Sequence, residues 1–78
     1  MSRGEYRVGI DFNPSSDDLV GRIKRAAADF IDLVDGIRDG EATTAAPEVG
    51  RCKALAATAI EEAAMWAVKA ATKPEPKG

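Results

Sequence analysis

The stretch RCKALAATAIEEAAMWAVKAAT, residues 51–72, decides the fold of this chain. Its apolar side chains recur at alternating steps of three and four residues, the spacing that places them on one face of an α-helix. Together with the residues just before it, this first seam consists of Val49, Cys52, Ala56, Ala59, Ala63, Trp66 and Ala70. A second apolar stripe beside the seam consists of Ile60, Ala64, Ala67 and Ala71. We therefore expect a helix over residues 47–72 whose apolar surface is wider than one neighbouring helix can cover.

Another helix is predicted upstream, over residues 15–39. Pro14 is excluded from a helix interior, and Ser15 or Ser16 can act as the N-cap by accepting a free amide hydrogen. The first seam of this helix consists of Leu19, Ile23, Ala26, Phe30, Leu33 and Ile37, and its second stripe of Val20, Ala27, Ile31 and Val34. As in the downstream helix, the two apolar rows exceed what a single partner helix can bury.

The segment between the two helices contains signals for a turn. Gly40 is expected to cap the end of the first helix, Thr44 to cap the start of the second, and Pro47 to lie in its first turn. A connection this short between two helices predicts an antiparallel hairpin.

The remaining segments are short. Residues 1–13 form an N-terminal arm in which YRVGI, residues 6–10, is compatible with a brief extended segment. The sequence KPEPKG, residues 73–78, ends the second helix because residues before proline avoid helical angles, and we expect it to be a flexible tail. Together, these segments predict one all-α domain over residues 1–78. It is a two-helix hairpin with a short N-terminal arm, and we expect it to assemble into a homo-oligomeric helical bundle.

Size favours that assembly. A chain of 78 residues buries too little surface to be very stable alone, and small domains usually rely on disulfides, metals or oligomerisation. The sequence has one cysteine, Cys52, and no histidine, so it has no internal disulfide and too few ligands for a structural zinc. Cys52 lies on the first seam and is predicted to be a buried, unreactive thiol.

The amino-acid composition indicates where in the cell the protein acts and which partners it is not expected to bind. A single cysteine, no secretory signal pattern and no apolar run of about 20 residues predict a cytoplasmic protein that does not enter a membrane. Residues 1–50 contain six Lys and Arg against ten Asp and Glu, and residues 51–78 contain five against three. Duplex nucleic acid is therefore not an expected partner, because binding it requires a strongly basic face.

Signals for catalysis are scarce. The commonest general base, histidine, is missing, no glycine-rich phosphate loop is present, and no cofactor is expected. Glu61 and Glu62 are adjacent along a helix and point about 100° apart, so we interpret them as solvated rather than as a catalytic pair. Met65 and Trp66 are predicted to be packing residues of a core or an interface.

Several residues have both a structural and a ligand-binding interpretation. Phe12 and Asn13 precede Pro14 and form either a hydrophobic staple with a helix cap or an aromatic ring and an amide presented to a ligand. Arg51 lies near a helix start, where anions are favoured, and can be a phosphate ligand or a surface cation. Lys24 and Lys69 have the same two interpretations.

The sequence also resembles a known family. An aromatic-Asn-Pro corner at residues 12–14, followed by RCKALAATAIEEAAMWA at residues 51–67, is similar to the phage anti-CBASS and anti-Thoeris sponges, which sequester cyclic nucleotide immune signals. The resemblance implies a helical hairpin that assembles into a homo-oligomer, typically a hexamer, with ligand pockets between protomers. It implies no enzymatic activity, and it places the protein in the cytoplasm of an infected bacterium.

The resemblance also implies which residues contact the ligand. Phe12 matches the aromatic ring that stacks on a base, with Tyr6 as a competitor, and Lys24, Arg51 and Thr58 match polar positions around the phosphates. Together with Asn13 and Lys69, these residues form the expected ligand site. The implied ligands are the cyclic di- and trinucleotides of CBASS, followed by the cyclic ADP-ribose signals of Thoeris. The alternative is a helical assembly module that binds a protein and no small molecule.

Overall fold

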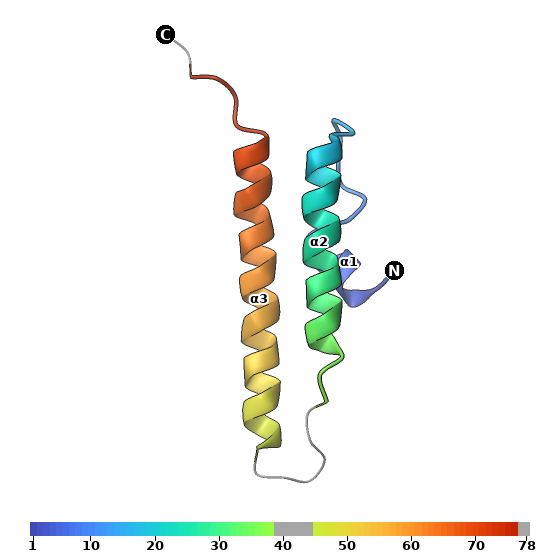
Figure 1. Ribbon diagram of the computed structural model, residues 1–78, viewed down its shortest axis with the longest axis vertical. Helices are drawn as coiled ribbons and strands as arrows, with labels where there is room; N and C mark the ends of the chain where they lie inside the picture. Colours follow the sequence, from blue (N-terminus) through green and yellow to red (C-terminus); the bar gives the residue numbers. More distant parts are fainter. Residues whose placement is uncertain (39–44, 77–78) are drawn as a thin grey trace.

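The computed structural model describes residues 1–38 and 45–76, which contain three α-helices and no strand. Helices α2 (Asp18–Asp35) and α3 (Ala46–Ala71) run antiparallel side by side, and the short helix α1 (Arg3–Val8) lies against α2 (Figure 1). The predicted all-α class is confirmed. The expected caps Gly40 and Thr44 lie outside the described residues, whereas Pro47 occupies the first turn of α3 as expected.

The start of α2 differs from the prediction. The N-cap is Asp17, whose Oδ1 accepts the amide hydrogens of Leu19 and Val20 at 2.8 and 3.3 Å. The predicted cap Ser16 instead has a positive φ of 51° and lies in a turn, its amide donating to the carbonyl of Asn13. A carboxylate in this position also complements the positive end of the helix dipole.

The end of α2 also comes earlier than residue 39. Gly36 is its C-cap, and the amide of Ile37 donates to the carbonyl of Val34 at 3.0 Å, which closes the helix with a tight turn. Glycine has a low helix propensity, which favours the end of the helix at Gly36.

The arm, whose structure the sequence left open, is helical at residues 3–8. Ser2 and Glu5 form a capping box: the Ser2 side chain accepts from the Glu5 amide at 3.1 Å, and the Glu5 carboxylate accepts from the Ser2 amide at 2.7 Å. Gly9 ends the helix in the left-handed conformation, with a φ of 65°, which a residue with a Cβ rarely adopts.

The core is thin and uses only one of the two apolar rows on each long helix. Its buried apolar residues are Val20, Ala28, Ile31, Val34, Ala57 and Ala64. These belong to or adjoin the second stripes, and the small alanines of α3 let the helix axes approach closely. The first seams are therefore left largely outside the hairpin.

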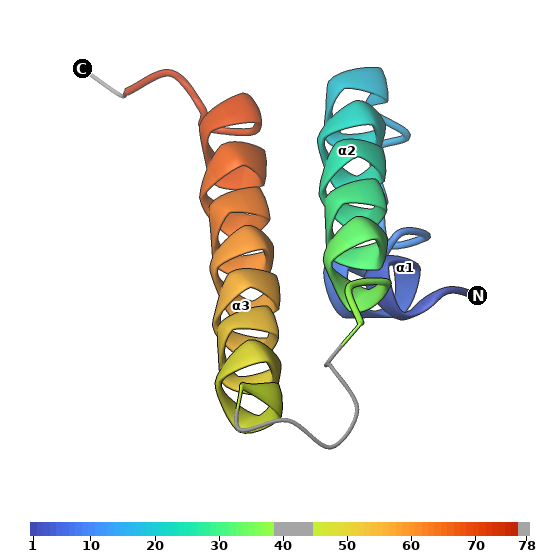
Figure 2. The same ribbon diagram turned by 60° about the horizontal axis from the view of Figure 1, so that its bottom comes forward.

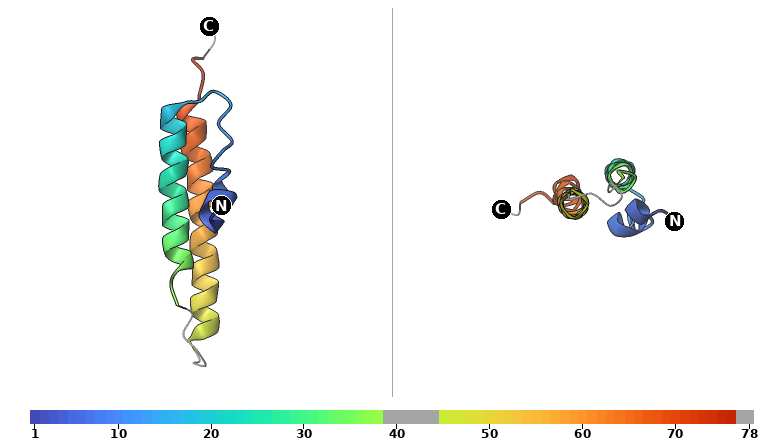
Figure 3. Two further views of the ribbon diagram at one scale, coloured as in Figure 1. Left: turned by 90° about the vertical axis from the view of Figure 1, so that its right-hand side faces the viewer. Right: turned by 90° about the horizontal axis from the view of Figure 1, so that it is seen from below.

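The first seams form a bare apolar face on the side of the hairpin opposite α1. In helix α2, α1 contacts the side that contains Arg25, Ala28 and Asp32, whereas Phe30 and Leu33 are exposed and lie roughly opposite at 100° per residue. Viewed along the helices, α1 occupies one side of the α2–α3 pair, and no other described element covers the opposite side (Figure 3).

Cys52 and Trp66 belong to this uncovered set. The prediction of a buried thiol is wrong for the single chain, because Cys52 is exposed. Trp66 is exposed as well, with the Lys69 ammonium 5.1 Å from its ring centre.

The molecule is accordingly open for its mass. Its accessible surface is 5869 Å², whereas a compact chain of 8.2 kDa exposes about 4,500 Å². The Cα radius of gyration is 15.5 Å, against about 11.5 Å for a compact chain of this length. None of the helices in residues 1–38 and 45–76 combines the length and apolar character that crossing a bilayer requires.

Candidate functional site

Helix α1 lies against the middle and the C-terminal part of α2 (Figure 2), and three polar contacts hold it there. The Gly4 amide donates to Asp32 at 2.7 Å, the Arg25 guanidinium pairs with Glu5 at 2.8 Å, and Arg3 pairs with Asp35 at 2.9 Å. Gly4 is buried, and a Cβ at this position would lie only 2.1 Å from the Ala28 carbonyl oxygen. Glycine thus lets the α1 backbone rest directly on the α2 backbone.

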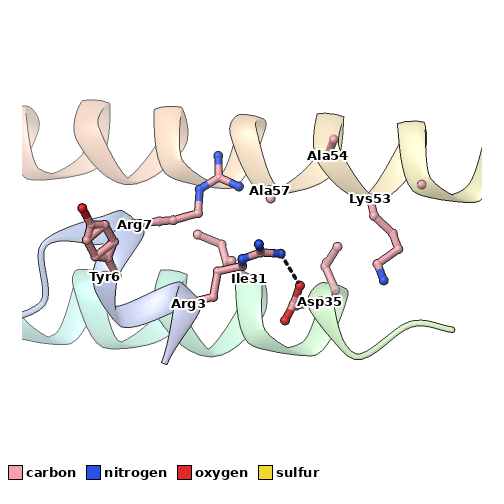
Figure 4. A pocket seen from close by; sticks show the side chains of 10 residues that line it. Arg3, Tyr6, Arg7, Ile31, Asp35, Lys53, Ala54 and Ala57 are labelled. Carbon is pink, nitrogen blue, oxygen red and sulfur yellow. Dashed lines mark hydrogen bonds and ion pairs between the residues drawn. The ribbon is translucent and has the colours of Figure 1, made fainter. Parts of the chain in front are cut away.

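A groove of about 600 Å³ opens between α1 and the two long helices (Figure 4). Its lining residues are Arg3, Tyr6, Arg7, Ile31, Val34, Asp35, Gly50, Lys53, Ala54 and Ala57. The floor is apolar, and the charged part of the lining consists of three cations and one carboxylate. A volume in the range of about 300–1,000 Å³ is typical of small-molecule sites, and the surplus of cations favours an anion.

Arg7 is the polar link from α1 to α3. Its Nε donates to Glu61 at 3.0 Å, and its Nη2 lies 3.4 Å from the Thr58 hydroxyl. The two charged side chains are partly buried, at 29% exposed for Arg7 and 35% for Glu61. Arg7 also lines a second hollow of about 300 Å³, together with Val8, Lys24, Glu61, Ala64, Met65 and Val68. A single guanidinium therefore stands at the junction of the two hollows.

Two carboxylates near α1 and α3 are held ionised by arginines. The hydrogen bond from Arg25, followed by that from the Ser2 amide, lowers the pKa of Glu5 from 4.5 to about 2. Hydrogen bonds from Arg51, at 2.9 and 3.2 Å, likewise lower the pKa of Glu48, and the same contact raises the pKa of Arg51. Arg51 is thus engaged within its own helix turn.

The pre-helix corner has a structural role in this chain. The Asn13 amide nitrogen donates to the Asp17 carbonyl at 2.8 Å, and its side-chain oxygen accepts from the Asp17 amide at 3.1 Å. Lys24 is buried, at 8% exposed, and its ammonium donates to the carbonyls of Gly9, at 3.0 Å, and Phe12. The same ammonium lies 5.3 Å from the centre of the Phe12 ring, which is otherwise exposed.

The predicted residues of α3 share one stripe but not one place. Arg51, Thr58 and Lys69 lie on the same side of the helix at 100° per residue. Eighteen residues separate the first from the last, about 27 Å at 1.5 Å per residue. Within one protomer, the six predicted residues therefore form two groups, a corner with Phe12, Asn13 and Lys24 and the stripe along α3.

Within residues 1–38 and 45–76, no three His, Cys, Asp or Glu side chains are grouped to hold an ion.

Comparison with known proteins adds the decisive observation. The model of the Acb2/Tad1 hairpin domain matches residues 5–72, which is most of the chain. The chain belongs to the Acb2/Tad1 hairpin family. The resemblance to the anti-CBASS and anti-Thoeris sponges is thereby confirmed, and with it a phage role as a nucleotide sponge. No curated protein and no solved structure matches the chain.

This Acb2/Tad1 hairpin contains polar residues that sequence reasoning missed. Arg3, Arg7 and Lys53 meet around the larger groove, and Tyr6 lies beside them. The signal was available in residues 2–5, because Ser-x-x-Glu is the pattern of a capping box. Once residues 3–8 are recognised as a helix, Arg3 and Arg7 fall one turn apart on a single face.

Proposed function

We propose that the protein binds and sequesters cyclic di- and trinucleotide signals of CBASS, without degrading them, in the cytoplasm of an infected bacterium. Cyclic ADP-ribose signals of Thoeris are a further ligand class. The single observation that carries this proposal is the family match over residues 5–72. A sponge requires affinity and no turnover, which fits a sequence that has no histidine.

The chemistry of the ligand suits the surface of the α1 side. Cyclic oligonucleotides present two or three phosphates and as many flat bases, which charge-assisted hydrogen bonds and aromatic stacking can hold. Stacking contributes about 1 to 3 kcal/mol per base. A groove with three cations and an exposed aromatic ring offers both kinds of contact.

The proposed ligand residues remain Phe12, Asn13, Lys24, Arg51, Thr58 and Lys69, divided between protomers. Because Arg51 and Lys69 lie about 27 Å apart along α3, one copy cannot bring all six residues to a single ligand, and the proposed site is therefore shared by two copies. Symmetry would then repeat each contact two or three times around a cyclic ligand.

Assembly into a homo-oligomer, with six copies as the expected number, is part of the same proposal. Its support is the bare apolar face, where Leu19, Phe30, Leu33 and Ile37 are exposed in the single chain. Burying such surface is the main driving force for association.

The test is calorimetry of the purified protein with cyclic dinucleotides and a cyclic trinucleotide, followed by heat release and chromatography of the released ligand. We expect binding at micromolar ligand or tighter and recovery of intact ligand. Degraded ligand would instead indicate an enzyme. No binding, combined with a stable oligomer, would support the alternative of a helical assembly module.

A further inference from the structure

We infer that two copies of this chain associate through antiparallel α3 helices, with Trp66 of each copy inserted into a hollow beside the start of α3 in the other copy. This inference rests on the homo-oligomer of the proposed function and deepens it, because it names the side chains that meet between two copies. It also gives a use to Trp66, which is 61% exposed in the single chain.

The hollow lies where α3 begins beside the end of α2 (Figure 1). It measures about 330 Å³, and its lining consists of Val34, Ile37, Glu48, Val49, Cys52, Lys53 and Ala56. Four of these residues, 49, 52, 53 and 56, have the spacing i, i+3, i+4 and i+7. In coiled coils, four residues of one helix with this spacing form the hole that receives a large side chain, the knob, from a facing helix. The hollow is therefore shaped for a side chain of another helix.

Trp66 is the matching knob. It is the only tryptophan of the chain and follows Cys52 by fourteen residues. At 100° per residue this is about 40° short of four full turns, so both residues face the same side of α3. The same fourteen residues separate them by about 21 Å along the helix axis. Trp66 thus cannot reach the hollow of its own chain, whereas a second copy can bring the two together.

Because the knob and the hollow belong to one helix, a two-fold axis fills two hollows at once. In such an interface, if residue i contacts residue j, then j also contacts i. The axis would pass near Ala59, midway between Cys52 and Trp66. The small side chains of Ala56, Ala59 and Ala63 continue the heptad spacing there and let two helices approach closely. An antiparallel pair of α3 helices therefore forms a closed contact and leaves the outer row of α2 for further contacts in the homo-oligomer.

The charges around the knob and the hollow favour the antiparallel arrangement. The Lys69 ammonium lies 5.1 Å from the centre of the Trp66 ring and would arrive with it. Glu48 lines the hollow, and its ion pair with Arg51 is exposed and contributes little to stability. Inserting Trp66 thus brings a cation to a carboxylate at both ends of the contact. A parallel pair would instead place the two Lys69 side chains beside each other.

The experiment compares Trp66→Ala, Cys52→Phe and the double variant of the full chain by native mass spectrometry over a dilution series, without nucleotide. Trp66→Ala removes the knob, and Cys52→Phe fills the hollow from an exposed position. In the double variant, the new phenylalanine of one copy can occupy the space that the missing indole leaves in the other. Met65→Ala is the matched control, because Met65 is equally exposed on α3 but lies on the α1 side.

We expect each single substitution to weaken association at least about 30-fold, as for a lost interface anchor. The double variant should recover at least about tenfold of this loss, and Met65→Ala should associate normally. Recovery cannot arise within one chain, since residues 52 and 66 are about 21 Å apart. On association, the fluorescence of Trp66 in the wild type should shift to shorter wavelength as its ring leaves water, and this shift should be absent in Cys52→Phe.

Normal association of either single variant, or losses that simply add in the double variant, would overturn the inference. A wild-type chain that binds cyclic nucleotides but stays a monomer would overturn it as well and leave the sequestering function standing. A chain that associates as described but binds no cyclic nucleotide would overturn the sequestering function alone.

Discussion

Lys24 is a buried cation that joins the turn after α1 to helix α2. Its ammonium replaces water with the carbonyl oxygens of Gly9 and Phe12 and the face of the Phe12 ring. Buried charges are tolerated when hydrogen bonds satisfy them in this way. The geometry gives Lys24 a structural role that is separable by experiment from the proposed contact with a phosphate.

The prediction for Lys24→Met is a loss of about 1 to 3 kcal/mol in the free energy of unfolding, because methionine fills similar space but removes the ammonium that donates to the Phe12 carbonyl and one of the two donors to the Gly9 carbonyl. Chemical denaturation measures it. Lys69→Met is the control: Lys69 is exposed, so its change should stay within about 0.5 kcal/mol. If Lys24→Met kept full stability and lost only ligand affinity, Lys24 would be a ligand cation and not a structural one.

Gly4 and Gly50 form a second pair of contrasting residues. A Cβ at Gly4 would overlap the Ala28 carbonyl oxygen, which belongs to the backbone and cannot rotate away, whereas a Cβ at Gly50 would meet nothing within 4 Å. We expect Gly4→Ala to destabilise the protein by roughly 1–3 kcal/mol. Gly50→Ala should stabilise it by about 1 kcal/mol, since alanine is the better helix former. Thermal unfolding of the two variants checks both signs, and a neutral Gly4→Ala would contradict the close approach of α1 to α2.

At the scale of elements, α1 is a helix that its own six residues cannot sustain. Isolated helices of this length are not stable in water, so its structure depends on the capping box and on docking to α2. Glu5 takes part in both, because its carboxylate accepts from the Ser2 amide and from Arg25. The protonation of one carboxyl group should therefore control the docking of the whole element.

The pH prediction follows from the lowered pKa of Glu5, about 2 in the folded protein against an ordinary value of 4.5. A lowered folded pKa means that the carboxylate stabilises the fold above about pH 4.5 and that this contribution is lost as the pH falls towards 2. We expect the difference in unfolding free energy between wild type and Glu5→Gln to be largest above pH 4.5 and to vanish near pH 2. A difference that stayed constant over this window would exclude Glu5 as the titrating group.

At the scale of the whole molecule, the hairpin has two unlike sides. One side carries α1 and the cation-lined groove, and the other carries the first seams of α2 and α3 with no described element over them. An apolar surface that extends along two helices is typical of an interface. The two sides therefore suggest separate tasks, ligand contact on one and association on the other.

A pair of matched substitutions tests this separation. Leu33 on the bare face and Met65 beside α1 are exposed to similar extents, 72% and 67%. We expect Leu33→Glu to dissociate the proposed homo-oligomer, because a charge would have to be buried, and Met65→Glu to leave the mass of that oligomer unchanged. Native mass spectrometry or light scattering measures the result. Intact oligomers of Leu33→Glu would show that the bare face is not the interface.

Much of the fold could be predicted because its signals are local. Periodic apolar residues, Pro14 and Pro47 defined two helices, and the short connection defined the hairpin. The sequence left the structure of residues 3–8 open, because YRVGI is compatible with an extended segment although Ser2 and Glu5 have the spacing of a capping box. For the site, the corner and the α3 stripe stay predictions from the sequence, and the groove cations were not predicted, since they meet only after α1 docks.

The sequence by itself determined that each long helix has two apolar rows and that one hairpin cannot bury both, because side-chain spacing along a helix is fixed by its geometry. Only the tertiary structure decided which row faces inward. On α3 the buried residues are the small Ala57 and Ala64, which let the two helices approach closely, and on α2 they include Ile31 and Val34. Phe30, Leu33 and Trp66 lie on other faces of their helices and project outward. The tertiary structure also decided where charge gathers: Gly4 seats α1 on α2, and this brings Arg3 and Arg7 opposite Lys53.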